Sequence, residues 1–387
     1  MKRLFYWLEW HLATPEFAGG LLLALAVFLF GAATNTLSGW LYVISGMSIA
    51  LLIIGAVFPA RFIQELKVER VEPPAVSVGE DLYVDTVVKN QGKTTKNLLE
   101  LRDTLPDGLS PVTSQELVLP SLAGKASFLW SYHVPTQKRG IYLLPPLQVA
   151  TASPFGLFRS RRYCGRGNTK VVVYPKVLTL SQCPLIDQMG RDRQQRYYSP
   201  RHSQQNATDG LTRTLRPYQW GDPMRMIHWR TSARFGNLQV RELETTVGGQ
   251  EVIIAIDLSP NWQELHFEQA MMVAATLYFY AQRANLQVSL WSAHTGTISG
   301  DRIVLSALAE LQPQPQPSGV PVQESAIVWL TSSGDSVADL QAGDRFICWQ
   351  CHIPSTQAQG ITCDPPQASD LEIEKFWHKN LQSKQPV

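Results

Sequence analysis

The stretch EVIIAIDLS, Glu251 to Ser259, decides the fold of the C-terminal half of the chain. An unbroken apolar run that ends on an aspartate is typical of a strand buried on both faces of a parallel sheet. The next segment, Glu264 to Asn285, has the length and apolar face of a helix, and LQVSLWSAH, Leu286 to His294, reads as a second strand. Strands that alternate with helices predict an α/β sheet with covered faces.

The same alternation continues toward the C-terminus. The sequence predicts a second helix at Asp301–Leu311 and two further strands, SAIVWLTSS from Ser325 and RFICWQC from Arg345. QPQPQPSGVP, Gln312 to Pro321, is a proline-rich connection. We therefore expect a Rossmann-like domain whose functional groups gather at the carboxyl ends of its strands.

Asp257, Ser259 and Asn261 follow the first of these strands. Their spacing resembles the Asp-x-Ser-x-Ser start of the metal site in von Willebrand factor A domains, because an alternating carboxylate and hydroxyl can share one hard cation. Asn261 stands where the second serine would be, and Ser332 follows the third strand where an aspartate is expected. At most a weakly bound Mg²⁺ is expected; the alternative is that Asp257 and Ser259 cap the following turn.

CWQCH, Cys348 to His352, has the spacing of covalent haem attachment. Zinc is a second alternative, with Cys363 as a further ligand. The favoured interpretation is neither, since a solitary motif in a buried strand is typical of cysteine acting as a small apolar residue. The five widely spaced cysteines are expected to be reduced thiols.

Two uncharged apolar runs lie near the N-terminus, Phe17–Ala33 and Trp40–Phe58, separated by the polar break TNTLSG. Each approaches the length that spans a bilayer, so residues 1–62 are predicted to be a membrane anchor of two transmembrane helices, with a buried core hairpin as the alternative. Basic residues flank the outer ends of both runs, which predicts a multi-pass protein of the cell inner membrane with both termini cytoplasmic.

The segment 63–176 is rich in strand-like runs such as DLYVDTVVKN and KASFLWSYHV, with turn signals such as NQGK and LPDG between them, and it predicts an antiparallel β-sandwich. The segment 177–210 is polar and reads as a linker or mobile loop. The rest, 211–387, carries a basic stretch and the α/β domain.

The composition and the absence of known motifs argue against several classes of function. The chain has 34 basic and 32 acidic residues and a net charge of +2, which argues against a general nucleic-acid binder. It contains neither a Walker A loop nor a dinucleotide-binding glycine motif, and its eight histidines fall in no motif with a nucleophile. The sequence therefore predicts a protein that is not an enzyme.

The basic stretch is RPYQWGDPMRMIHWRTSAR, Arg216 to Arg234, which holds four arginines, two tryptophans and one acidic residue, Asp222. One interpretation is structural: a hairpin in which Asp222, Glu242 and Glu244 pair with arginines while Trp220 and Trp229 pack on a neighbouring domain. The other is a docking surface, because tryptophan and arginine dominate binding hot spots.

This stretch resembles the signature of the domain of unknown function 58 family, as do the upstream KRGIYLL and SPFGLF segments. The resemblance implies a membrane-anchored protein with a β-sandwich and a von Willebrand factor A-like region, often encoded beside a MoxR-type AAA+ ATPase, with no established activity. The partner-binding positions that it suggests are Arg216, Tyr218, Gly221, Asp222, Arg225, Trp229, Ser232 and Arg234.

The resulting hypothesis is a non-enzymatic adaptor or scaffold that works with a MoxR-type ATPase and an unknown client. One alternative is an enzyme of unrecognised type that uses Asp222 and His228 as an acid/base pair, or a metal at Asp257. A further alternative is a protein that binds anionic lipid or polyphosphate through its arginines.

Overall fold

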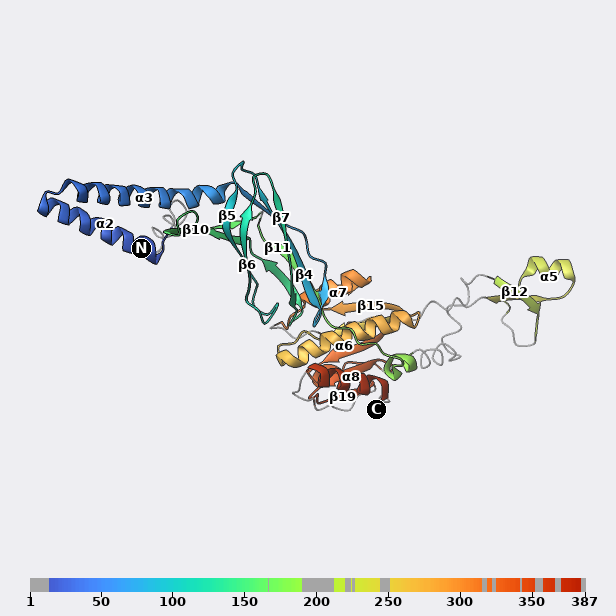
Figure 1. The fold of residues 1–387 in the computed structure, drawn as a ribbon. Coiled ribbons are helices and arrows are strands. Elements are labelled where there is room, and N and C mark those ends of the chain that lie inside the picture. Colours follow the sequence, from blue (N-terminus) through green and yellow to red (C-terminus); the bar gives the residue numbers. More distant parts are fainter. Residues whose placement is uncertain are drawn as a thin grey trace. The chain divides into compact units, whose positions relative to one another are not determined.

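The computed structural model describes residues 14–165, 167–189, 212–219, 224, 227–243, 251–314, 319–321, 325–341, 343–351, 358–365 and 370–383 (Figure 1). The chain divides into two compact units, Met1–Pro175 and Lys176–Val387.

Two long apolar helices open the first unit: α2 (Phe17–Thr36) and α3 (Gly39–Gln64). Both are long and apolar enough to cross a membrane, as expected from the sequence. Small residues seven positions apart, Gly19, Ala26 and Ala33, are buried on α2, and a small residue at Ala26 lets α3 approach closely. Ser45 of α3 donates its hydroxyl hydrogen bond to the Ala26 carbonyl at 2.9 Å. Most of the large apolar side chains on both helices are exposed.

Helix α3 continues almost directly into β2 (Leu66–Arg70), so the helical hairpin and the following β-domain are joined by a very short connection. Lys96 strengthens this joint, because its buried ammonium pairs with Glu65 and lies 4.5 Å from the centre of the Phe62 ring. The end of the helix is thereby fixed to the β-domain.

The β-domain is built from three sheets with the strand orders β2-β4-β7, β1-β10-β9-β5-β6 and β3-β11-β8. Every pairing in them is antiparallel except that of β3 with β11. Apolar residues that alternate along the strands fill two buried clusters. The strands are β1 (Thr14–Pro15), β3 (Val76–Ser77), β4 (Asp81–Asn90), β5 (Lys96–Thr104), β6 (Ser114–Leu122), β7 (Ser127–Pro135), β8 (Gly140–Leu144), β9 (Leu147–Thr151), β10 (Phe158–Cys164) and β11 (Thr169–Tyr174).

A buried polar triad connects two of these sheets. Arg70 of β2 binds both carboxylate oxygens of Asp103 of β5, at 2.7 and 2.6 Å, and the Tyr132 hydroxyl of β7 donates to the same carboxylate at 2.6 Å. Burial, followed by the charge of Asp103, raises the pKa of Tyr132 far above its usual range. Tyr132 therefore remains a proton donor at any physiological pH.

The second unit contains a six-stranded sheet of order β16-β15-β14-β17-β18-β19, in which only the β15–β16 pair is antiparallel. The predicted strands and helices are present, and β14 lies between β15 and β17. Their bounds are β14 (Glu251–Ile256), α6 (Glu264–Arg283), β15 (Gln287–Ser292), β16 (Gly296–Ile298), α7 (Asp301–Glu310), β17 (Ala326–Thr331), η2 (Asp335–Val337), β18 (Arg345–Trp349), β19 (Gln359–Cys363) and α8 (Asp370–Ser383).

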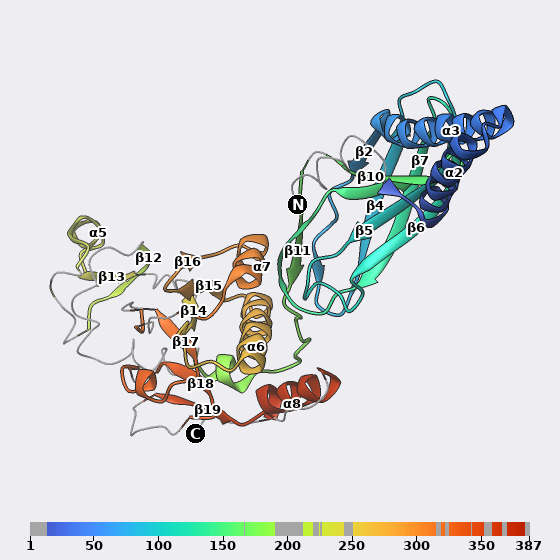
Figure 2. The same cartoon turned by 90° about the vertical axis from the view of Figure 1, so that its left-hand side faces the viewer.

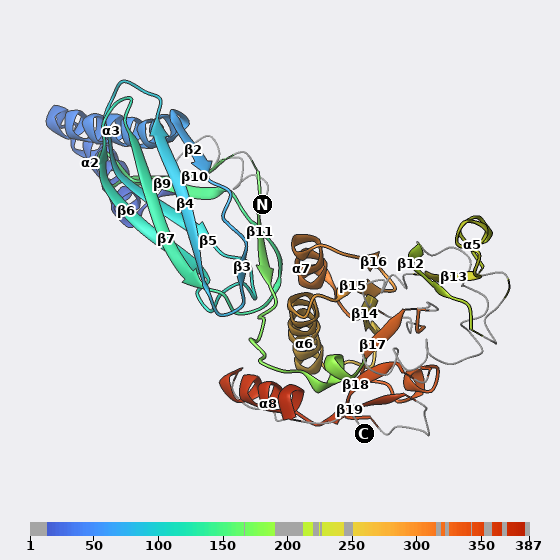
Figure 3. The same cartoon turned by 90° about the vertical axis from the view of Figure 1, so that its right-hand side faces the viewer.

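Helices α6, α7 and α8 cover one face of this sheet (Figures 2 and 3). Apolar side chains from the helices and strands form the largest buried cluster among the described residues there. Within it Trp349 and Trp377 both donate their indole N–H to Gln269, at 3.4 and 3.3 Å. The opposite face carries a second cluster around Trp329 and Phe346, covered in part by η2.

The prediction of a linker over 177–210 is wrong for its first residues, 177–189. Leu178, Leu185 and Met189 are buried in the core of the α/β unit. The backbone N–H of Leu178 donates to the Thr276 hydroxyl of α6 at 3.0 Å. Because these apolar residues are separated by polar ones, the segment has a polar average composition although it packs as core. Residues 190–211 lie outside the described part of the chain.

Candidate functional site

The basic stretch folds into a small β-hairpin with a helix between its strands, which we call the signature module (residues 212–243). Its antiparallel strands are β12 (Thr212–Pro217) and β13 (Gln239–Leu243), and its helix is α5 (Trp229–Phe235) (Figure 1). Ile227 bridges to Val240, and both are buried.

Two polar residues of the module hold the helix in place. His228 is the N-cap of α5, and its ring Nδ1 accepts the backbone hydrogen bond of Thr231 at 3.2 Å. Ser232 is 7% exposed; its hydroxyl donates to the His228 carbonyl at 3.0 Å and accepts from the Gln239 N–H of β13 at 2.8 Å. Ser232 and His228 therefore serve the fold of the module, although Ser232 was among the predicted partner-binding residues.

The large side chains of α5 point away from β13, toward solvent. Trp229 is 60% exposed and Phe235 is 67% exposed, and Arg230 and Arg234 are also exposed. Met224 adds a further exposed apolar side chain. The module thus presents an indole, a phenyl ring and guanidinium groups to solvent, which is the composition of a binding hot spot.

The remaining signature positions divide between described and undescribed residues. Tyr218 is half-buried, and its backbone N–H donates to the Leu238 carbonyl at 2.9 Å. Arg216 of β12 is half-buried and hydrogen-bonds the Pro217 carbonyl at 3.4 Å. Gly221, Asp222 and Arg225 lie outside the described residues, so of the acid/base pair Asp222 and His228 only His228 is described.

The prediction missed Phe235, Met224 and Leu238, which are exposed in the module. The sequence contains a feature that could have predicted the exposure of Phe235. This apolar residue directly precedes Gly236, whose positive φ of 72° ends the helix. A large apolar residue at the last turn of so short a helix has little helix surface of its own to pack against.

The strand-end cluster at Asp257 brings together two of the three predicted metal-site residues. Asp257 is 1% exposed, and its Oδ1 accepts the Ser259 N–H at 3.0 Å. Its Oδ2 accepts the hydroxyls of Ser259 at 3.1 Å and of Thr331 at 2.7 Å. Asn261 is exposed. Both carboxylate oxygens are therefore already bonded to groups of the chain itself.

Thr331 ends β17, which pairs in parallel with β14, so the two strands bring Thr331 and Asp257 to the same edge of the sheet. The Ser332 hydroxyl beside it is buried and has no hydrogen-bond partner among the described residues. In that part of the chain no group of three His, Cys, Asp or Glu side chains is placed to hold a metal ion.

Cys348 and Cys351 form a disulfide, so the expectation of reduced thiols is wrong for this pair. While bonded, they can supply neither thiolates to zinc nor thiols to haem. Cys363 is a buried free cysteine on β19, and His352 lies outside the described residues.

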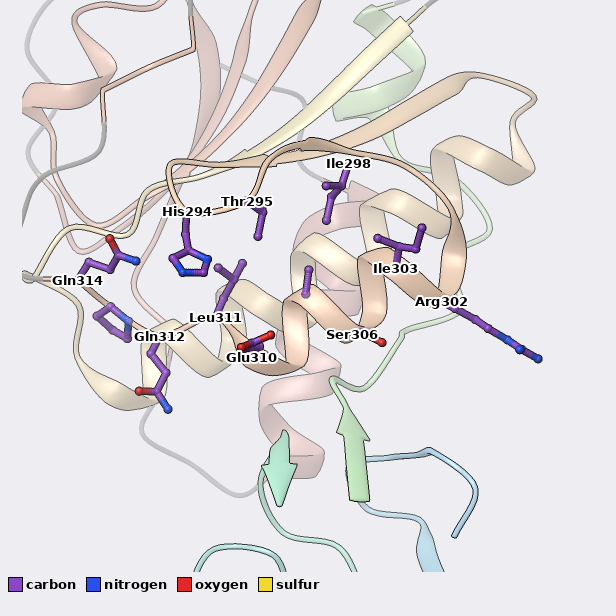
Figure 4. Close-up of a pocket in the computed structure, with 12 residues that line it drawn as sticks. His294, Thr295, Ile298, Arg302, Ile303, Ser306, Glu310, Leu311, Gln312 and Gln314 are labelled. Carbon is purple, nitrogen blue, oxygen red and sulfur yellow. The ribbon is translucent and has the colours of Figure 1, made fainter. Parts of the chain in front are cut away.

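A groove of about 750 Å³ lies beside α7 (Figure 4). His294 and Thr295 line it from the turn after β15, and Ser306 and Glu310 line it from α7. Arg302 extends away from these residues in the view (Figure 4). The groove has an apolar component in Ile298, Ile303 and Leu311 and includes none of the predicted site residues.

The family comparison matches the signature module and part of the α/β unit. Residues 214–325 match the family described as protein of unknown function DUF58. The matched range contains α5 and, from the strand-end cluster, Asp257 and Ser259, and it ends before Thr331. The family description assigns no activity to these residues.

Solved structures share only local similarity with the chain. The CARDB domain of a Pyrococcus furiosus protein, solved with di-metal ions, is 16% identical over 28% of this chain and 91% of that chain, with a TM-score of 0.20. A mutant β-glucosidase from Listeria innocua is 13% identical over 30% and 16% of the two chains, with a TM-score of 0.19. The alkylpurine DNA glycosylase AlkC of Pseudomonas fluorescens is 14% identical over 28% and 30%, also at 0.19. No curated protein matches the chain.

Proposed function

We propose that this chain is a membrane-anchored, non-enzymatic adaptor whose signature module docks a protein partner, a MoxR-type AAA+ ATPase, and brings it to a client at the membrane. In this proposal α2 and α3 cross the inner membrane, and both termini and the α/β unit are cytoplasmic. The α/β unit is a von Willebrand factor A-type domain, which its central β14 and the Asp257–Ser259–Thr331 cluster support.

The observation that carries the proposal is the exposure of Trp229 on a helix that the chain itself holds in place. Ser232 and His228 use their hydrogen bonds to fix α5 to β13, so the indole is presented on an ordered support. An ordered aromatic side chain loses little conformational entropy on binding, and a nearby guanidinium gives the partner a charge to recognise.

The arginines suggest the charge of the partner surface. Arg230 and Arg234 are exposed on the same short helix as Trp229. An acidic patch with an apolar pocket for the indole would complement this surface, since charge complementarity steers association and an aromatic anchor supplies most of the affinity.

Affinity capture of the full-length protein from cells tests the proposal. Trp229→Ala should abolish capture of the AAA+ ATPase at matched expression, whereas Leu265→Ala, which truncates an exposed side chain of α6, should leave capture intact. Ser232→Ala serves as the variant that weakens the fold of the module. If Trp229→Ala and wild type captured equal amounts of the ATPase, the docking role would be excluded.

A further inference from the structure

An uncharged loop with the sequence SPFGLF, Ser153–Phe158, connects β9 to β10 in the first unit and includes the first residue of β10. Phe155 at its centre is 50% exposed. We propose that this loop inserts into the interfacial layer of the lipid bilayer and forms a third membrane contact beside the two helices. The inference rests on the proposed transmembrane placement of α2 and α3.

The loop lies against the first turn of α2. The N–H of Glu16, the residue before α2, donates to the Leu157 carbonyl at 2.9 Å. A Cβ placed on Gly19 would overlap that same carbonyl, so the backbones of helix and loop are in direct contact. Strand β1 continues the contact, since Pro15 pairs with Phe158.

The depth of this contact follows from the helix geometry. The 20 residues of α2 rise about 30 Å, which matches the hydrocarbon thickness of a bilayer, so the first turn of α2 lies at the hydrocarbon boundary. On α3 the side chains of Leu157 and Phe158 pack against Gly55, inside the uncharged run that ends at Phe58. Arg61 comes six residues after Gly55, or about 9 Å further along the helix.

The loop therefore lies on the membrane side of Arg61, the first charged residue of α3. Ion pairs keep it there: Arg159, the residue after the loop, pairs with Glu16 at 2.8 Å and with Glu100 of β5 at 3.2 Å. These ion pairs join the loop both to the N-terminal end of α2 and to β5 of the β-domain. The loop cannot move away from α2 unless the ion pairs break.

Lipid is the occupant that this position favours. Phe155 and Phe17, the first residue of α2, are both exposed, and they lie on the two segments that meet where Gly19 contacts the Leu157 backbone. Exposed Tyr163 and Arg161 follow on β10, and aromatic and basic residues are enriched at the level of the lipid headgroups.

Photo-crosslinking in native membranes tests the inference. The photoreactive analogue p-benzoylphenylalanine replaces Phe155, Phe28 in the middle of α2, or Tyr83 in separate variants of the full-length protein. Tyr83 is the matched control, an exposed aromatic residue of β4. It lies seven residues along the strand from Asn90, or about 23 Å, and Asn90 pairs with Leu66 at the exit of α3.

The expected result is lipid adducts from positions 28 and 155, several-fold above the yield from position 83, with the three variants equally folded by hydrogen exchange. Adducts at 28 but background yield at 155 would overturn the loop inference and leave the anchor standing. Background yield at 28 would overturn the transmembrane placement itself. Crosslinking of position 155 to another protein in place of lipid would also overturn the inference.

Discussion

Replacing Thr331 with valine removes one hydroxyl from the Asp257 cluster without changing the size of the side chain. The Asp257 carboxylate then loses its shortest hydrogen bond, at 2.7 Å, in a site where it is 1% exposed. A hydrogen bond to a charged group contributes about 1.5–3 kcal/mol to stability, and a buried acceptor that loses its donor forfeits that amount. The Ser333 N–H also loses its acceptor at Thr331, which places the cost in the upper half of the range.

The loss should appear as a lower melting temperature of the α/β unit. For a unit of about this size, 1 kcal/mol corresponds to a shift of roughly 2–4 °C, so Thr331→Val should lower the melting temperature by roughly 5–12 °C. Differential scanning fluorimetry of the full-length protein in detergent measures the shift. Hydrogen exchange of peptides from β14 and β17 assigns it to this unit.

Ser332→Ala is the matched control, because its hydroxyl has no hydrogen-bond partner among the described residues. It should leave the melting temperature unchanged. Mg²⁺ should also have no effect on wild type, since both Asp257 oxygens are already bonded and a ligand must bind the native state to stabilise it. A rise with Mg²⁺ that Thr331→Val abolishes would show instead that the cluster is a cation site, and the reasoning would be refuted.

Three further predictions concern the first unit and the core. Gly19→Ala should destabilise the contact of α2 with the β9–β10 loop, because the added Cβ overlaps the Leu157 carbonyl. Gly20→Ala, which meets open space, should be neutral or stabilising by up to about 1 kcal/mol, and unfolding in detergent compares the two variants. Burial raises the pKa of the Cys183 thiol to about 12, so iodoacetamide at pH 8 should modify it only after denaturation, as mass spectrometry would show. Asp103→Ala should cost about 3–5 kcal/mol, because it leaves the Arg70 guanidinium buried without its carboxylate; a loss below 1 kcal/mol in denaturant unfolding would exclude this role.

Hydrophobic pattern alone predicted much of the architecture. The runs that became α2, α3, β14 and β17 are long and uninterrupted, so their burial can be inferred from local sequence. β19, with the sequence QGITC, is short and mixed in character, and it was missed. The core segment from Leu178 to Met189 was also missed, because only the three-dimensional packing shows which of its residues face α6.

The site was less predictable, because its defining contacts join residues far apart in the chain. Asp257 and Thr331 meet only through the parallel pairing of β14 with β17. For the signature module, the sequence favoured neither a structural role nor a docking role over the other. The structure separates the described positions: Ser232 packs inward, while Trp229 and Arg234 are exposed.

The central claim is that Trp229 lies in a docking surface, and in-cell photo-crosslinking from position 229 tests it most directly. p-Benzoylphenylalanine at 229 should form a covalent adduct with an AAA+ ATPase, identified by mass spectrometry, while the same group at Leu265 should not. Adducts from position 229 that join only segments of this same chain would contradict the claim and assign Trp229 to the fold.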